Sequence, residues 1–125
     1  MSLLAVVAPL AWPFLGAGQT TIEELQAAIV AHHNDSLAHY RLAVIRLGER
    51  SYMDAANHYR SALDGNLKPR WLEVWSLIGL GKIYDATGQR ERAILQYRAA
   101  LRTKDDTDGA LREAAKYLAS PYVPQ

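Results

Sequence analysis

The sequence predicts an all-α fold in which antiparallel helix pairs stack side by side and a last helix closes the stack. Two observations carry this prediction. The segment 59–63 (YRSAL) recurs as 97–101 (YRAAL), an offset of 38 residues that also pairs other small and apolar positions. Helix caps and glycine or proline breaks then divide the rest of the chain into helix-length segments. No segment is expected to form a strand.

Composition limits the function without selecting one. The chain has 125 residues, enough for one domain, and its formal net charge is +1. Basic and acidic residues are interspersed, which argues against nucleic acid as a partner. Cysteine is absent, so a disulfide, a thiolate metal site and a cysteine nucleophile are all excluded.

Residues 1–17 are uncharged and mostly apolar, and Pro9 and Pro13 would break a long helix there. The run is too short to span a bilayer comfortably, so no stable membrane insertion is expected. With small residues before Gln19, residues 1–18 resemble a signal peptide without its basic start. That interpretation predicts a periplasmic or secreted protein. The alternatives are a misassigned start or an apolar segment packed on the first helix, and then a cytoplasmic protein.

The helical domain is predicted over 20–119 and begins with half of a repeat at 20–34. Thr21 and Glu24 have the spacing of a capping box, in which each side chain satisfies the other residue's backbone N–H. An apolar face follows, and the helix should end near His33 and Asn34. Its partner helix in a complete pair is missing.

A full helix pair is predicted over 36–65. Asp35 and Ser36 can cap a helix that runs to Leu47 and is terminated by Gly48. Its partner begins at Ser51 and runs to about residue 64, with a glycine as the residue that leaves the helix.

The second pair, 69–105, contains the most apolar helix of the chain. Pro69 suits its first turn, and apolar side chains lie nearly all round it, so it should be buried on more than one side. Gly88 can adopt the positive φ that ends this helix. The partner helix spans 90–102, with Arg90 expected on the solvent side.

A capping helix is predicted over 107–119, followed by a tail at 120–125. One apolar stripe and one charged face suit a helix that closes the open end of a stack. The acidic run 105–109 fails as a calcium loop, because Lys104 and Ala115 stand where ligands are required. These acids are better explained as helix caps.

The second pair resembles a tetratricopeptide repeat. Leu80 and Gly81 precede Tyr84 by the family's L-G-x2-Y spacing, and Ala93 lies four residues before Tyr97. The 38-residue spacing exceeds the 34 of the family, which predicts about one extra helical turn between 65 and 74. Trp is also missing at its usual position, and neither copy ends in Pro. The resemblance implies a short tetratricopeptide-type α-solenoid with a C-terminal capping helix.

In this family the first helix of each repeat lines a concave groove that binds peptides. The resemblance therefore implies a groove for a protein or peptide partner, lined by four residues of each copy: Leu37, Tyr40, Val44 and Leu47 from the first, and Trp75, Ile78, Lys82 and Asp85 from the second. Several of them could instead be core residues in so short a stack. If the surface around Lys82 is not the site, the edge formed by the last helix and the tail is the next candidate.

No chemistry of another kind emerges from the sequence. The four histidines have no metal-site spacing, and no nucleophile elbow or phosphate-binding glycine loop occurs. We therefore expect no catalytic residue, no cofactor and no metal. The predicted function is a non-catalytic interaction module. The alternative is a purely structural repeat unit, homologous to or a fragment of the C-terminal end of a larger multi-repeat protein. The sequence leaves the oligomeric state open.

Overall fold

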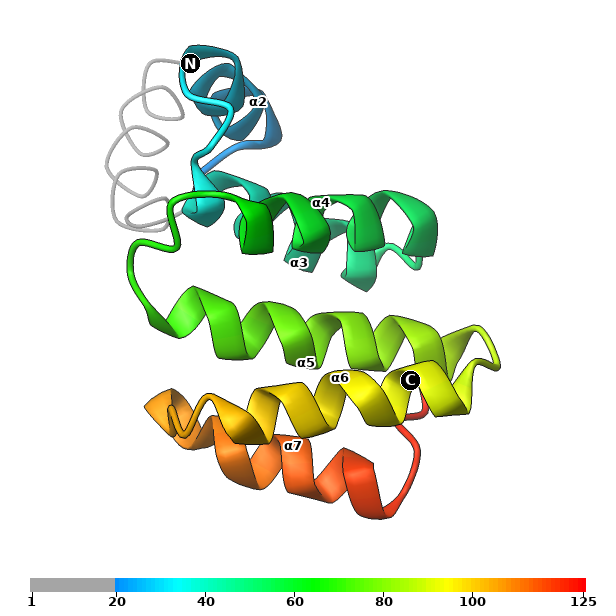
Figure 1. Ribbon diagram of the computed structural model, residues 1–125. Helices are drawn as coiled ribbons and strands as arrows, with labels where there is room; N and C mark the ends of the chain where they lie inside the picture. The colour runs from blue at the N-terminus through cyan, green and yellow to red at the C-terminus, as the bar shows by residue number, and fades with distance from the viewer. Residues whose placement is uncertain (1–19) are drawn as a thin grey trace, which may run out of the picture.

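The computed structural model describes residues 20–125, and every regular element in that range is helical. Figure 1 shows each helix from α4 onward running back along its predecessor, so that the helices form a stack with α2 at one end and α7 at the other. The all-α prediction is confirmed. The elements in order are α2 (Ile22–Ala31), α3 (Ser36–Gly48), α4 (Tyr52–Asp64), α5 (Trp71–Ala86), α6 (Arg90–Arg102), a 3-10 turn (Thr107–Gly109) and α7 (Ala110–Ala119).

The leader predicted at 1–18 lies outside the described residues. Within 20–125, no helix has the length and apolar character needed to cross a membrane.

The caps that the sequence predicted hold the helix starts. Thr21 Oγ1 accepts from the Glu24 amide at 3.1 Å, and the Glu24 carboxylate accepts from the Thr21 amide at 3.2 Å. Asp35 accepts from the Ala38 amide at 3.0 Å and so caps α3. Asp106 accepts from the Leu111 amide at 2.9 Å in the first turn of α7. Each side chain satisfies a backbone donor that the helix geometry leaves without an internal partner.

The ends of α3 and α5 differ in the residue that adopts positive φ. Gly88 has the expected positive φ of 76° after α5. At the end of α3, however, Gly48 is still helical, and the left-handed residue is Arg50, with φ of 61°. Arg50 is the counterpart of Gly88 at the 38-residue offset. A side chain therefore stands in the first copy where the second copy has the residue that suits this conformation best.

Gly65 ends α4 for a different reason from the one expected. Its φ is −89°, which any residue can adopt. A β-carbon there would collide with Ser36 Oγ and lie 2.6 Å from the carbonyl oxygen of Asn34. Ser36, fully buried, donates to the Ala62 carbonyl at 2.6 Å and accepts from the Leu67 amide at 2.9 Å. The start of α3 is thereby joined to the connection between α4 and α5.

Helix α5 lies at the centre of the stack and has close contacts on two sides. A β-carbon on Gly79 would collide with the ring of Tyr59 from α4, and one on Gly81 would collide with the ring of Tyr97 from α6. Each glycine thus lets a neighbouring helix approach with a tyrosine against the α5 backbone. In the 38-residue register, α5 begins earlier than α3, since Val74 matches Ser36 and α5 starts at Trp71. The expected extra helical turn is therefore present.

Candidate functional site

The eight predicted groove residues lie on the first helices of the two pairs, α3 and α5. Helix α5 contacts α3 on one side and α7 on the other. We call the surface that these three helices form the α3–α5–α7 face. The α3 and α5 halves of the predicted groove differ in how much of them remains at the surface.

The α3 half keeps its side chains partly open. Val44 is 45% exposed, while Leu37, Tyr40 and Leu47 are half-buried. The ring of Tyr40 makes edge contacts with Trp71 at 5.4 Å and with Tyr59 at 5.9 Å between centroids. Burial, and then the nearby charge of Asp108, raise the pKa of Tyr40. Positions 40, 44 and 47 follow one another on a single side of the helix, so they form one apolar strip.

The α5 half is covered by α7 at its start. Ile78 is only 1% exposed and packs in a cluster with Ala110 and Ala114 of α7. Trp75 is half-buried, and its indole N–H donates to the Thr107 carbonyl at 3.0 Å. Ile78 is therefore a core residue, which corrects its prediction as a groove residue. The physical reason is that the capping helix lies over the side of α5 that carries it.

Lys82 is held among side chains of α7 and the tail. Its ammonium lies 3.5 Å from the Glu113 carboxylate, and its side chain is 20% exposed. The same ammonium lies over the rings of Tyr117 and Tyr122, at 5.5 Å and 5.4 Å from their centroids. Such contacts are favourable because the ring face carries partial negative charge. Lys82 is thus not the open charge that the sequence suggested.

Asp85 is the acceptor of a buried polar cluster. Its side chain is 1% exposed. It accepts from the Tyr97 hydroxyl at 2.8 Å, from the Arg90 guanidinium at 3.0 Å and 3.1 Å, and from the Tyr122 amide at 2.9 Å. Burial, followed by the hydrogen bond to Asp85, raises the pKa of Tyr97.

The Asp85 cluster corrects two expectations. Asp85 is not on the open surface of a groove, because Arg90, Tyr97 and the tail enclose its carboxylate. Arg90 does not lie free on the solvent side, because it also donates to the Leu118 carbonyl at 2.8 Å. Helix α5, helix α6 and the end of α7 therefore meet at a single carboxylate.

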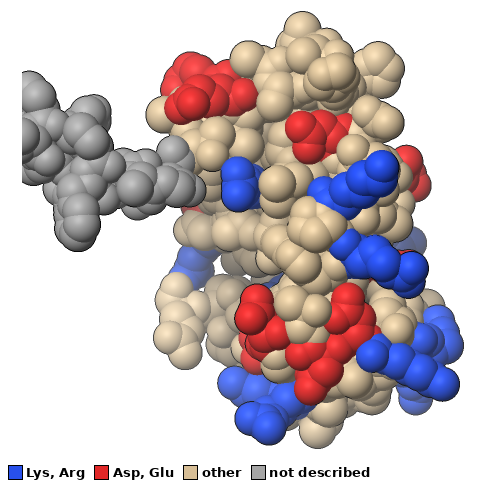
Figure 2. Space-filling view, turned by 90° about the vertical axis from the view of Figure 1, so that its left-hand side faces the viewer, with Lys and Arg blue, Asp and Glu red and all other residues tan. Residues whose placement is uncertain are grey.

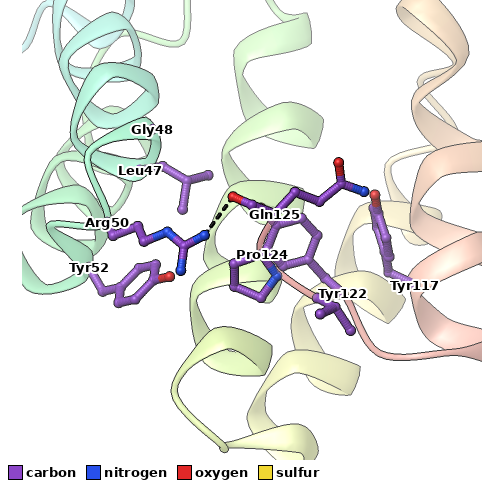
Figure 3. A pocket seen from close by; sticks show the side chains of 9 residues that line it. Leu47, Gly48, Arg50, Tyr52, Tyr117, Tyr122, Pro124 and Gln125 are labelled. Carbon is purple, nitrogen blue, oxygen red and sulfur yellow. Dashed lines mark hydrogen bonds between the residues drawn. The ribbon is translucent and has the colours of Figure 1, made fainter.

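The tail folds back over the α3–α5–α7 face and adjoins a cavity of about 320 Å3. Figure 3 shows the tail passing between the turn after α3 and helix α7, with α5 behind it. The Arg50 guanidinium reaches across and donates to the carbonyl oxygen of Gln125. We call this cavity the tail cleft, and its lining residues are Leu47, Gly48, Arg50, Tyr52, Tyr117, Tyr122, Val123, Pro124 and Gln125.

Several residues of the tail cleft were missed by sequence reasoning. Arg50, Tyr52 and Tyr117 have no periodicity or motif that marks them as surface-site residues. For Arg50 a signal was available, because the 38-residue offset aligns it with Gly88 at the end of a helix. The tail itself was only a second-choice site, and it lies beside Leu47 of the predicted groove.

A charged rim marks one end of the same face. Figure 2, which views the molecule from the left side of Figure 1, shows acidic side chains gathered in its lower half. The connection between α6 and α7, which lies at that end in Figure 1, contributes Asp105, Asp106 and Asp108. Hydrogen bonds from Thr107 lower the pKa of Asp105. Figure 2 also shows Lys and Arg side chains on both sides of these acids, so the rim is of mixed charge.

Two histidines that are distant in sequence meet between α3 and α4. His39 Nδ1 lies 3.2 Å from His58 Nδ1, and His39 Nε2 lies 3.1 Å from the His33 carbonyl oxygen. Because a carbonyl only accepts, His39 carries a proton on Nε2, and one of the two Nδ1 atoms donates to the other. Across residues 20–125, no group of three or more potential metal ligands occurs.

Comparison with known proteins adds no relative: the chain matches no protein-family model, no curated protein and no solved structure.

Proposed function

We propose that the chain is a non-catalytic interaction module of the tetratricopeptide type that binds an extended peptide on its α3–α5–α7 face. The observation that carries the proposal is that an extended segment of the chain, the tail, already lies against α5 and forms one wall of the tail cleft. The apolar strip of Tyr40, Val44 and Leu47 continues from that cleft along α3. Aromatic and apolar side chains with few charges are typical of the central part of a peptide-binding surface.

The mixed charge of the rim and the burial of the α5 residues limit the kind of partner and the part of the face that can bind it. The partner binds along α3 and at the tail cleft, because Ile78 and the Asp85 side chain are buried and cannot contact it. A protein or peptide suits this surface better than nucleic acid, because its basic side chains are interspersed with acidic ones. The proposal assigns no cofactor and no metal.

One observation favours the alternative function, a purely structural repeat unit. Helix α7 and the tail cover most of the α5 side of the face, as the next repeat of a longer stack would do. In that case the face would be an internal contact and would take no partner.

The test compares two exposed apolar residues, Val44 on the proposed binding face of α3 and Leu95 on α6, outside that face. A library of displayed random heptapeptides is selected on the full chain, and the enriched peptides are then measured on two variants. Val44→Asp places a charge in the apolar strip of α3, and Leu95→Asp places the same charge on α6, where Leu95 is 60% exposed. Both substitutions are at the surface, so the fold should tolerate them.

We expect Val44→Asp to weaken binding at least about tenfold, because an unpaired charge would be desolvated beneath the peptide. Leu95→Asp should leave the dissociation constant unchanged. Enriched peptides that bind both variants equally would contradict the proposal. A selection that enriches no peptide would favour the structural unit.

For location, we propose export directed by residues 1–18, with a cytoplasmic protein as the alternative. The support is the uncharged apolar run that precedes Gln19. Amino-terminal sequencing of protein from a bacterial periplasm should then begin near Gln19. Recovery of the intact run on protein from the cytoplasm would contradict export.

A further inference from the structure

The tail has the side-chain pattern of a bound extended peptide. Tyr122 and Pro124 are half-buried, whereas Pro121, Val123 and Gln125 are exposed. This alternation is what an extended segment shows when one of its sides lies on a surface. Two main-chain groups are also held: the Tyr122 amide donates to Asp85, and the Gln125 carbonyl accepts from Arg50.

The ring of Tyr122 contacts side chains of α5 and α7 on the α3–α5–α7 face. The ring lies edge-on to Tyr117, at 5.4 Å between centroids, and the Lys82 ammonium is 5.4 Å from its centre. Burial raises the pKa of Tyr122, followed by the effects of Tyr117 and Tyr52. The contacts found on Tyr122 are thus with its ring and its backbone amide. An aromatic ring of any kind would satisfy this subsite.

Arg50 provides a second, independent observation. It holds a left-handed conformation, with φ of 61°, where the equivalent position of the second copy is Gly88. A bulky residue in this conformation is strained, and strained residues concentrate at binding sites. Arg50 is one of four non-glycine residues with positive φ within 20–125, and it is the one that donates to the tail.

Resting on the proposed function, we infer that the tail is a tethered ligand of its own chain. Its Tyr122-x-Pro124 motif occupies the subsite at which the partner binds. The partner is an extended peptide with an aromatic residue followed two positions later by proline, and it must displace the tail to bind. The proline suits the surface because its ring pre-sets an extended conformation and lowers the entropy lost on binding.

The experiment supplies the tail as a separate peptide. The probe is a fluorescent hexapeptide of sequence SPYVPQ, corresponding to residues 120–125, with both ends blocked. It is titrated into the full wild-type chain and into full-length Tyr122→Ala, whose own tail has lost its ring. A tethered segment competes at an effective concentration in the millimolar range. We therefore expect Tyr122→Ala to bind the probe about tenfold more tightly than wild type does.

Peptide variants test the motif. A probe with Phe in place of Tyr should bind Tyr122→Ala as well as the original does, and a probe with Ala there should lose at least about tenfold in affinity. Thermal unfolding followed by circular dichroism verifies that Tyr122→Ala is folded. If that variant unfolds, Pro124→Asp releases the other half-buried residue and leaves the Tyr122 contact with Asp85 in place.

Matched receptor variants identify the surface that the probe uses. Arg50→Gly and Lys104→Gly each remove a cation from a left-handed position, since Lys104 has φ of 56°. Of these two residues, Arg50 is the one that donates a hydrogen bond to the tail. Introduced into Tyr122→Ala, Arg50→Gly should weaken probe binding severalfold, and Lys104→Gly should leave it unchanged.

The outcomes separate this inference from the proposed function. A folded Tyr122→Ala chain that does not bind the probe, or probe binding that Arg50→Gly and Lys104→Gly affect equally, overturns the tethered ligand. If selected heptapeptides then still lose affinity in Val44→Asp, the proposed function stands alone. A concentration-dependent dimer that Tyr122→Ala abolishes would instead place the tail in a second copy and contradict the occupant proposed here.

Discussion

The two helix pairs, α3–α4 and α5–α6, share their internal packing and differ at the positions of the predicted groove. At the 38-residue offset, Tyr59 and Tyr97 are both buried, each against a glycine of α5. At the groove positions, Val44 is exposed whereas its counterpart Lys82 is held by Glu113. Leu47 lines the tail cleft, and its counterpart Asp85 is the centre of a buried polar cluster.

This difference shows that the 38-residue offset determines how the helices of each pair pack against one another. The segments that follow in the chain determine which groove positions remain exposed. Helix α7 and the tail lie against α5, so residues at the groove positions of α5 acquire partners. No described helix covers the α3 strip in the same way, and its residues remain apolar and accessible. Exchanging residues between equivalent positions should therefore have unequal effects.

The largest effect is expected from Asp85→Leu, which gives the second pair the residue of the first. The Tyr97 hydroxyl, the Arg90 guanidinium and the Tyr122 amide would all lose their acceptor. The loss of a buried partner of this kind lowers the free energy of unfolding by about 3 kcal/mol. Urea unfolding of the variant measures it. Asp85→Asn keeps an acceptor oxygen and should lose clearly less; equal losses would mean that the cluster is not held by hydrogen bonding.

Gly81→Ala is the second exchange, because Ala43 holds this position in the first pair. Alanine is the better helix former by about 1 kcal/mol. Its β-carbon would nevertheless collide with the Tyr97 ring, and overpacking should leave a net loss of about 1–2 kcal/mol. Gly48→Ala is the control, since nothing lies within 4 Å of that site, and it should gain about 0.5 kcal/mol. Thermal melting that ranks the two variants in the opposite order would contradict the contact.

The third exchange reverses the residues at the two helix ends. Arg50→Gly should raise the free energy of unfolding by about 1 kcal/mol, because glycine adopts positive φ without strain. Gly88→Arg should lower it by about the same amount. Denaturant melts of the two single variants measure both changes. A loss of stability in Arg50→Gly would show that its contact with Gln125 outweighs the backbone strain.

The smallest effect concerns the histidine pair, which has no equivalent in the second pair. Burial, then the charges of His39 and Arg46, lower the pKa of His58 below its ordinary 6.5, while Asp54 acts in the opposite direction. The unfolded chain therefore binds a proton more readily in this range, and stability falls as pH drops below about 6.5. Melting temperatures between pH 7 and pH 5 should show the decline. His58→Gln should flatten it, and an unchanged slope would assign the decline to other groups.

Much of the fold follows from local signals in the sequence. Thr21, Asp35 and Ser51 mark helix starts, and the expected limits of α6 and α7 agree with the structure. These signals are local, because a cap or a glycine acts within one turn of its own position. They did not indicate the left-handed residue after α3, because Arg50, and not a glycine, adopts that conformation.

The site was harder to predict because its contacts are remote in sequence. The Tyr122 amide is 37 residues from Asp85, and Arg50 is 75 residues from Gln125. Periodicity indicates that a position lies on a given side of a helix. It does not indicate which later segment will cover that side. Lys82 and Asp85 were therefore predicted as open residues, although α7 and the tail hold them. In the α3 strip, Val44 stays exposed, whereas Tyr40 and Leu47 are half-buried.

The buried hydroxyl of Ser36 has a mechanical consequence. It hydrogen-bonds to α4 through the Ala62 carbonyl and to the segment before α5 through the Leu67 amide. Helix α5 has 16 residues and begins at Trp71, shortly after Leu67. At 1.5 Å per residue this helix is about 24 Å long, so a rotation of about 5° about its first residue would move its last residue by roughly 2 Å. The far end carries Asp85, whose carboxylate accepts from the Tyr122 amide, so a displacement at Ser36 would reach the tail from the opposite end of the helix.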